Sequence, residues 1–229
     1  MSNVTRAMPR DAAREIARAF LPKGLFGSRY PYHYARIKLA SDPLYPGVCD
    51  ALRGSTAPLL DIGCGMGLLA HALRRDGQTL RYRGVDADHT KIERARMAAT
   101  RAQLMDASFE HVDLERGQPA HTGSVTILDV LQFIDPSAQS ATLDAAVAML
   151  VPGARLVIRT GLDDGSGRAR ITRGVDVFSR VIGWMRSGPE RYPAREALQQ
   201  RFDDAGLRSR FAPLRGNTPF NNWLVVAER

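Results

Sequence analysis

Short apolar runs alternate with amphipathic stretches over the middle of the chain, from about residue 58 to residue 160. The apolar runs have the length of buried strands, and the stretches between them carry the three-to-four-residue apolar spacing of helices. Such alternation predicts a parallel sheet with right-handed crossovers and helices on both faces. The predicted strands are 59–62, 80–85, 109–112, 124–130 and 154–159, and the predicted helices are 67–75, 88–103 and 137–150.

The pattern differs in the two flanks. The N-terminal flank predicts an amphipathic helix over 11–21, ended by Pro22, and a short helix over 43–53. Between them lies an aromatic segment with Tyr30, Tyr32 and Tyr34. The C-terminal flank predicts helices over 173–186 and 194–205, then an antiparallel hairpin of strands 207–214 and 222–228.

These elements together predict an α/β fold. We expect a Rossmann-like, seven-stranded, mostly parallel sheet with helices on both faces and an antiparallel last strand. Residues 1–57 are expected to form a helical cap over the ligand site. Residues 58–229 would form the main domain, with a lid-like insertion at about 161–193.

Composition narrows the class of protein. The 229 residues are 44% hydrophobic and 24% charged, which fits one large globular domain. Two cysteines, Cys49 and Cys64, exclude a disulfide-rich scaffold and a cysteine zinc cluster, and no metal site is predicted. No secretory leader and no apolar run near the roughly 20 residues of a spanning helix is found, so we expect a cytoplasmic protein without a transmembrane segment.

The net charge of +8 is unevenly distributed. The excess of basic over acidic residues lies in residues 1–58 and 159–215 and not in the middle of the chain. Such flanks attract anionic partners, among them nucleic acid, an acidic carrier protein, a phosphorylated metabolite or a membrane surface, or they are simply solvated. No zinc-finger, RNP-type or basic-zipper pattern occurs, which disfavours nucleic acid.

The sharpest chemical signal is the stretch Leu60-Asp61-Ile62-Gly63-Cys64-Gly65-Met66-Gly67. An apolar strand runs into three alternate glycines and then into a helix, so the turn is tight and its main chain is open to a ligand. The dinucleotide fingerprint would require glycine at position 68, which is leucine. Carboxylates also end the next predicted strands, as Asp86, Asp113 and Asp129. The carboxyl ends of parallel strands are the edge where open α/β sheets bind ligands.

The glycine-rich turn and these strand-end acids resemble the class I S-adenosylmethionine-dependent methyltransferases over roughly residues 58–160. The resemblance implies S-adenosylmethionine as cofactor and S-adenosylhomocysteine as product. Gly63, Cys64, Gly65 and Gly67 would line the methionine part, and Asp61 would orient its ammonium group through the loop. The remaining cofactor residues it implies are Asp86 for the ribose, Ala87 against the adenine, Asp113 with the Leu114 amide at the adenine edge, and Asp129 beside the methyl group.

The resemblance leaves the acceptor open. A histidine often follows the fourth strand in small-molecule members, but Gln132 stands here and cannot remove a proton. The Asn/Asp-Pro-Pro-Tyr/Phe tetrad of nucleic-acid amino methyltransferases is also missing. His33 is the candidate catalytic base, and Arg36 or Lys38 is a candidate partner of the cofactor carboxylate.

The aromatic residues of the flanks predict an apolar or aromatic substrate. The candidate substrate residues are Tyr30, Tyr32, Tyr34, Gln132, Phe178 and Trp184. Residues 34–45 also resemble small-molecule methyltransferases of bacterial aryl-polyene pigment pathways. We therefore expect O-methylation of a small aromatic or lipid-like metabolite, and an acidic carrier protein that holds this metabolite is a candidate partner. The alternatives are an RNA or protein methyltransferase that uses the basic flanks, and a non-catalytic Rossmann-like binding subunit.

Overall fold

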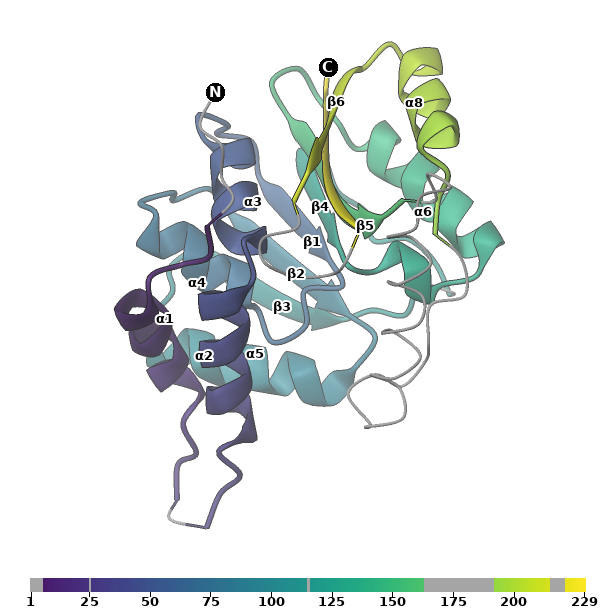
Figure 1. The fold of residues 1–229 in the computed structure, drawn as a ribbon. Helices are drawn as coiled ribbons and strands as arrows, with labels where there is room; N and C mark the ends of the chain where they lie inside the picture. Colours follow the sequence, from purple (N-terminus) through teal and green to yellow (C-terminus); the bar gives the residue numbers. More distant parts are fainter. Residues whose placement is uncertain (1–5, 25, 115, 163–191, 215–220) are drawn as a thin grey trace.

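A computed structural model describes residues 6–24, 26–114, 116–162, 192–214 and 221–229. Seven strands form one sheet in the order β3-β2-β1-β4-β5-β7-β6 (Figure 1). Strands β1 to β5 are parallel to one another, whereas β7 is antiparallel to both β5 and β6. The strands are β1 (Leu59–Ile62), β2 (Tyr82–Asp86), β3 (Ala107–His111), β4 (Ser124–Leu128), β5 (Arg155–Gly161), β6 (Arg208–Pro213) and β7 (Asn222–Glu228).

The helices cover both faces of this sheet (Figure 1). One face carries α1 (Arg10–Ala17), η1 (Arg18–Phe20), α2 (Tyr30–Ser41), α3 (Leu44–Leu52), α4 (Leu68–Arg75) and α5 (His89–Arg101). The other face carries α6 (Pro136–Ala148) and α8 (Arg195–Asp204), and η2 (Leu131–Phe133) follows β4. The predicted Rossmann-like α/β fold with an antiparallel last strand is confirmed.

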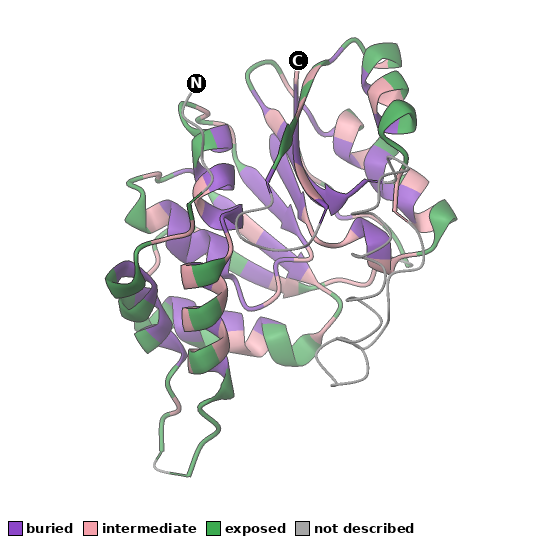
Figure 2. Ribbon diagram, in the orientation of Figure 1, coloured by how far each residue is buried: buried purple, intermediate pink, exposed green. Residues whose placement is uncertain are grey.

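Two apolar cores follow from the alternation of side chains along the strands. Leu59 and Val157 face the core under α1–α5, whereas Leu60 and Leu156, their neighbours in sequence, face the core under α6 and α8. The parallel strands β1 and β4 are buried along nearly their whole length (Figure 2), as expected for strands covered on both faces.

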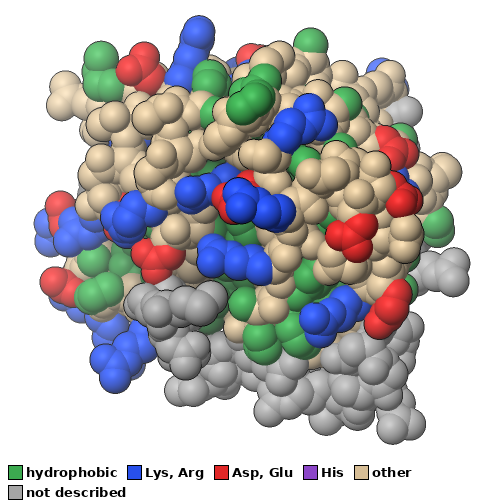
Figure 3. Space-filling view, turned by 90° about the horizontal axis from the view of Figure 1, so that it is seen from above, with side chains coloured by type: hydrophobic (Ala, Val, Ile, Leu, Met, Phe, Trp, Pro, Cys, Tyr) green, Lys and Arg blue, Asp and Glu red, His purple; other side chains and the backbone are tan. Residues whose placement is uncertain are grey.

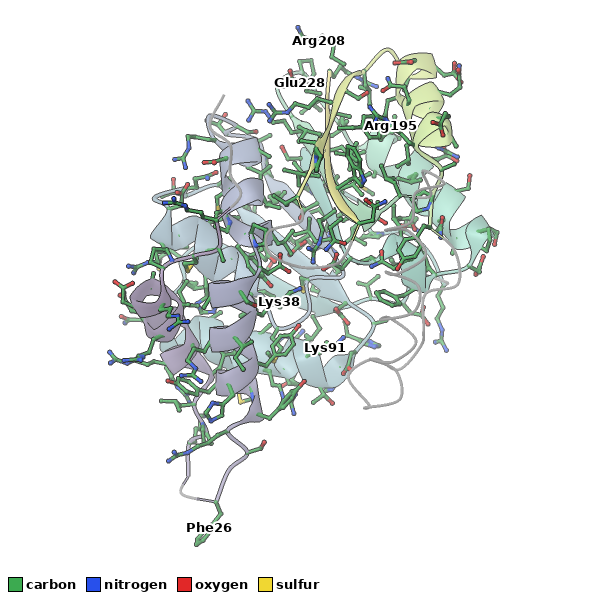
Figure 4. All side chains as sticks on the ribbon, in the orientation of Figure 1. Phe26, Lys38, Lys91, Arg195, Arg208 and Glu228 are labelled. Atoms are coloured by element: carbon green, nitrogen blue, oxygen red, sulfur yellow. The ribbon has the colours of Figure 1, made fainter. Side chains whose placement is uncertain are left out.

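The N-terminal flank contains a helix that the periodicity did not predict. Residues 30–41 form α2, whose buried positions are Pro31, Ala35 and Leu39. The buried stripe is narrow, with one residue per turn, and apolar tyrosines lie on either side of it. The four-residue spacing of the buried positions therefore does not stand out in the sequence. Pro31 lies in the first turn, where a proline costs no hydrogen bond. Beyond η1 the chain projects from the body, and Phe26 is fully exposed near its tip (Figure 4).

Several predicted elements shift by a few residues or lie outside the described chain. The second strand spans Tyr82–Asp86 and the third spans Ala107–His111, since the register of the parallel ladder decides their ends. The predicted helix 173–186 and most of the predicted insertion 161–193 lie outside the described residues. In the described part of the chain, every helix is too short or too polar to cross a membrane.

Candidate functional site

The turn after β1 is closed at its two ends and open at its centre. All three glycines have positive φ, +73° at Gly63, +57° at Gly65 and +77° at Gly67. A Cβ atom at Gly63 would lie 2.2 Å from Cγ2 of Val130, and one at Gly67 would lie 2.5 Å from the Phe109 ring. A Cβ atom at Gly65 would meet nothing within 4 Å. The main chain at Gly65 therefore borders open space that a ligand can enter.

Asp86, at the end of β2, holds this open part of the turn. Its Oδ2 accepts a hydrogen bond of 2.8 Å from the Gly65 N–H, and its Oδ1 accepts one of 2.8 Å from the Asp88 N–H. Each carboxylate oxygen accepts more than one bond, so Asp86 retains capacity for two hydroxyl groups. The adjacent Ala87 carbonyl lies 3.0 Å from Nε2 of His111. Asp86 thus fixes the loop through the Gly65 N–H and can still accept hydrogen bonds from a ligand.

Asp61 lies beneath the turn and is 2% exposed. The Tyr82 hydroxyl donates to its Oδ2 at 2.5 Å and the Thr126 hydroxyl donates to its Oδ1 at 2.7 Å. Burial raises the pKa of Asp61 to about 6, although the two hydroxyl donors oppose this shift. Asp61 therefore acts on a ligand only through the loop above it, by its charge and by fixing β1.

Asp113 and Leu114 follow β3 at the same edge of the sheet. The Val112 N–H donates to the Asp86 carbonyl at 3.1 Å, which places this segment beside the end of β2. Nε of Arg116 lies 3.4 Å from Oδ2 of Asp113. Asp113 and Leu114 are only partly buried. The structure thus brings the predicted cofactor carboxylates of β1, β2 and β3 to one edge.

Cys64 has a packing role in the turn. A Cβ atom at Gly84 would lie 2.8 Å from Sγ of Cys64, so the thiol occupies the space above that glycine. Burial raises the pKa of the Cys64 thiol well above its ordinary value, with the carboxylates Asp61 and Asp86 acting in the same direction. The thiol is therefore protonated and unreactive at neutral pH.

Asp129, at the end of β4, lies in a cluster of charged side chains. Its backbone has φ of +60°, an uncommon conformation for a residue other than glycine. The guanidinium of Arg159, which is 4% exposed on β5, donates to Asp129 and also to Asp42 at 3.0 and 3.2 Å. Lys38 of α2 donates to Asp42 at 2.7 Å and its Nζ lies 3.6 Å from Oδ2 of Asp129.

The charges of this cluster stabilise one another. Burial alone would raise the pKa of Asp42, but Arg159 and Lys38 outweigh burial and lower it to about 2. Burial likewise opposes the positive charge of Lys38 and Arg159, and the carboxylates Asp129 and Asp42 outweigh it and raise both pKa values. Lys38, Asp42 and Arg159 are thus ionised at neutral pH.

The candidate substrate residues of the N-terminal flank lie on two sides of α2. Tyr30, Tyr34 and Lys38 recur every four residues and form one stripe, with the Tyr30 and Tyr34 rings 6.0 Å apart. Tyr32 packs at 5.1 Å against His33, which is exposed. Only the first stripe leads to Asp129.

The remaining candidates are divided between the core and the part of the chain outside the described residues. Gln132 is 8% exposed, and its Oε1 accepts a bond of 3.3 Å from the Thr160 hydroxyl, so it links η2 to β5. Phe178 and Trp184 lie outside the described residues. Among the described residues, no group of three or more His, Cys, Asp or Glu side chains could hold a metal ion.

Sequence reasoning missed Asp42 and Arg159. The available signal was an arginine directly after the apolar run Leu156–Ile158, since a charged residue within a covered strand requires a partner. That partner could not be named, because Asp42 lies 117 residues away in the chain.

Three arginines gather at the opposite edge of the sheet. A groove there is lined by Arg155, Arg208, Arg210 and Glu228, at the start of β5 and β6 and the end of β7. Figure 4 places Arg208 and Glu228 at the top and Lys38 near the lower ends of the strands. Seen from that top end, lysine and arginine side chains are spread across the face (Figure 3). The groove therefore does not extend the glycine-rich site.

Comparison with known proteins agrees with this geometry. Residues 59–153 match the family model described as a methyltransferase domain. The chain is 27% identical over 149 residues to a ubiquinone biosynthesis O-methyltransferase of Psychrobacter arcticus, an alignment that covers 60% of this chain and 56% of that protein. It is 26% identical over 242 residues to the protein of the same name from Brucella ovis, with coverage of 95% and 92%. The chain spans about half the length of the first curated relatives that it matches.

Solved structures share the fold at low identity. A magnesium protoporphyrin IX methyltransferase from Synechocystis, crystallised with S-adenosylhomocysteine, matches with a TM-score of 0.62 and 18% identity over 96% of this chain and 98% of that one. A mitomycin 7-O-methyltransferase matches with a TM-score of 0.63 and 21% identity over 88% of this chain and 57% of that one. At these identities the likeness supports the fold.

Proposed function

The chain contains a class I S-adenosylmethionine-dependent methyltransferase domain, and from this premise we propose that it transfers a methyl group from S-adenosylmethionine to an oxygen atom of a small aromatic or lipid-like molecule. The observation that carries the proposal is the turn that is packed at Gly63 and Gly67 and open at Gly65, beside the spare acceptor capacity of Asp86. The names of the curated relatives favour oxygen as the acceptor atom.

The residues of the β1–β3 edge fit the cofactor. Gly63, Cys64, Gly65 and Gly67 would line its methionine part, which reaches the main chain at the opening above Gly65. Asp86 would accept both ribose hydroxyls on the lone pairs that its two backbone bonds leave. Ala87 and Leu114, with the Asp113 carboxylate, would border the adenine. The buried charge of Asp61 would favour the cofactor ammonium through the loop.

When bound, the cofactor supplies a methyl group on a positively charged sulfur, which is already activated for transfer. The chain then has to hold the acceptor oxygen about 3 Å from the methyl carbon, in line with the carbon–sulfur bond, and to exclude water. The stripe of Tyr30 and Tyr34 on α2 offers an aromatic surface for this at the β4 edge.

Two experiments test the proposal together. Calorimetry with S-adenosylhomocysteine measures cofactor binding, and transfer of a labelled methyl group is followed against catechols, monophenols, long-chain alkyl phenols, matched anilines and total RNA. We expect micromolar binding and label in the phenols. Label in RNA alone, lost on raising the salt, would instead support the nucleic-acid alternative. Binding without label in any acceptor would support the non-catalytic subunit, and no binding at all would refute the cofactor site.

A further inference from the structure

Two polar atoms with spare hydrogen-bonding capacity meet at the carboxyl end of β4. The ammonium of Lys38 has three donors, of which Asp42 takes one at 2.7 Å, and its Nζ lies 3.6 Å from Oδ2 of Asp129. Arg159 donates to that same Oδ2 of Asp129. Within the described residues no hydrogen bond reaches Oδ1 of Asp129. One donor and one acceptor are therefore left side by side.

Both side chains are accessible, and Asp129 is next in the chain to a residue that packs on the glycine-rich turn. The Lys38 and Asp129 side chains are each 27% exposed. Val130, next to Asp129 in the chain, packs against Gly63 so closely that a Cβ atom there would lie 2.2 Å from its Cγ2. Figure 4 shows Lys38 on α2, near the lower ends of the strands. A hydroxyl group bound by the pair would thus lie beside the methionine part of the proposed cofactor site.

We propose that Asp129 and Lys38 together bind the acceptor hydroxyl and that Asp129 receives its proton; this inference rests on the proposed O-methyl transfer. Lys38 Nζ donates to the acceptor oxygen, and the hydroxyl donates to Oδ1 of Asp129. A lone pair of that oxygen forms the bond to the methyl carbon while the carbon–sulfur bond breaks and its electron pair stays on sulfur. The hydroxyl proton moves to Asp129, so charge and atoms balance.

Asp129 need not be a strong base for this step. The proton on an oxygen that is gaining a methyl group becomes far more acidic than a carboxylic acid, so transfer to Asp129 is downhill once the carbon–oxygen bond has begun to form. Lys38 stays protonated because Asp129 and Asp42 raise its pKa against the effect of burial. It therefore serves as a donor to the oxygen and not as the base.

The histidines offer no base beside Asp129. His71 is buried against Phe20, His89 packs against His111 beside Ala87, and His121 lies at the opposite edge near Ser124. His33 shares α2 with Lys38, but the five positions between them turn it about 140° around the helix. These are all five histidines of the chain.

The groups facing Asp129 come from four elements. They are Arg159 on β5, Lys38 and Tyr34 on α2, Asp42 after α2, and Tyr45 on α3. Burial raises the pKa of both tyrosines, so they are uncharged at neutral pH. Arg159 is a positioning residue, because it joins Asp42 and Asp129 and so sets where Lys38 meets Asp129.

Asp129→Asn is the decisive variant. Asparagine tolerates the left-handed backbone at this position, keeps the size of the side chain and still accepts from Arg159, but it cannot take a proton. The rate is measured from pH 6 to pH 10 with the phenol of the panel that wild-type protein methylates fastest. We expect kcat to fall roughly 100-fold below the pKa of the free phenol. It should then rise about tenfold per pH unit and approach wild type once the phenol ionises by itself.

The controls separate this role from cofactor binding and from stability. Affinity for S-adenosylhomocysteine should stay within about twofold in Asp129→Asn. Asp144→Asn, which alters an exposed carboxylate of α6 that pairs with Arg201 of α8, should behave as wild type. A pH–rate profile of Asp129→Asn that matches wild type would overturn the proposal. A large fall of kcat in a parallel His33→Ala variant would also overturn it. Wild-type protein that binds S-adenosylhomocysteine but methylates no phenol would refute this acceptor class, and the pair's role with it, while leaving the cofactor site intact.

Lys38→Met tests the donor half of the pair. We expect KM for the phenol to rise about tenfold and kcat to fall, with affinity for S-adenosylhomocysteine unchanged and with Lys23→Met, an exposed lysine of the projecting segment, as matched control. A tenfold loss of affinity for S-adenosylhomocysteine at unchanged KM for the phenol would assign Lys38 to the cofactor carboxylate and overturn the proposal.

Discussion

The two halves of one sheet edge hold their carboxylates in different ways. At the ends of β1 and β2, Asp61 and Asp86 accept bonds from hydroxyl and backbone N–H groups. At the ends of β4 and β5, Asp129 and Asp42 are held by Arg159 and Lys38. The first half keeps its carboxylates uncompensated by cations, which suits a positively charged ligand. The second half is a balanced set of charges, which suits a neutral hydroxyl.

The origin of the partners also differs. The turn, Asp86 and the N–H groups that bind it lie within about 25 residues of chain, so this half is formed by one strand–helix–strand unit. The charged half joins Lys38 of α2 and Asp42, the residue after α2, to β4 and β5, with Asp42 and Arg159 separated by 117 residues. Its geometry therefore depends on how α2 packs on the sheet.

The largest expected effect is on stability, at the charged half. Arg159→Met leaves Asp42 and Asp129 with Lys38 as their common cation, and breaking a buried ion pair in this way costs about 3–5 kcal/mol. Urea unfolding measures the loss. Arg155→Met, in the same strand but with its side chain 26% exposed, should cost about 1 kcal/mol. Equal losses in the two variants would show that the charged half is not stabilised by a buried ion pair.

The next largest effect is on ligand binding, at the glycine-rich half. Gly65→Arg fills the opening above the turn, and we expect at least a 100-fold loss of S-adenosylhomocysteine affinity, about 2.7 kcal/mol by calorimetry. Stability should fall by only about 1–2 kcal/mol, from the strain of a side chain at positive φ. Gly54→Arg, another open glycine of positive φ outside the site, is the matched control and should bind normally.

The dependence of stability on pH should have opposite signs for two buried groups near the turn. The folded pKa of Asp61 is raised to about 6, so its contribution is full below about pH 4 and is lost as the pH rises through 6. Burial lowers the folded pKa of His71 to about 4, so its contribution is full above about pH 6.5 and is lost as the pH falls through 4.

Unfolding curves between pH 4 and pH 7 check these signs. Relative to wild type, Asp61→Asn should gain on the order of 2–3 kcal/mol as the pH rises, and His71→Leu should gain a similar amount as the pH falls. If the difference in unfolding free energy between each variant and wild type did not change with pH, folding would not shift the pKa of either group, and the prediction would be wrong. The balanced charges of Asp42 and Arg159 should add no step in this range.

The smallest effect should be the same in both halves. Asp88 caps α5 beside β2, and Asp135 caps α6 after β4, each by accepting from two backbone N–H groups. Asp88→Ala and Asp135→Ala should each cost about 1 kcal/mol in thermal unfolding. A much larger loss at Asp135 would show that the charged half includes side chains other than Lys38, Asp42, Asp129 and Arg159.

The sequence predicted the sheet, its order of elements and the residues of the glycine-rich half. Periodicity gave the strands because their apolar runs are covered on both faces, and the spacing of glycines gave the turn. It missed α2, since the buried stripe of Pro31, Ala35 and Leu39 is narrow and lies among tyrosines. It also selected His33, which shares α2 with the site but lies on another side of the helix from Lys38.

By itself, then, the sequence determined what neighbouring residues decide: strand, turn, helix and the acid that ends each strand. Only the tertiary structure paired Asp129 with Arg159 and Lys38, and it alone showed that Gly65 is open whereas Gly63 and Gly67 are packed. The reason is physical. Hydrophobic periodicity and backbone conformation are local properties, but the partner of a buried charge is whichever residue the packed chain brings within a few ångströms of it.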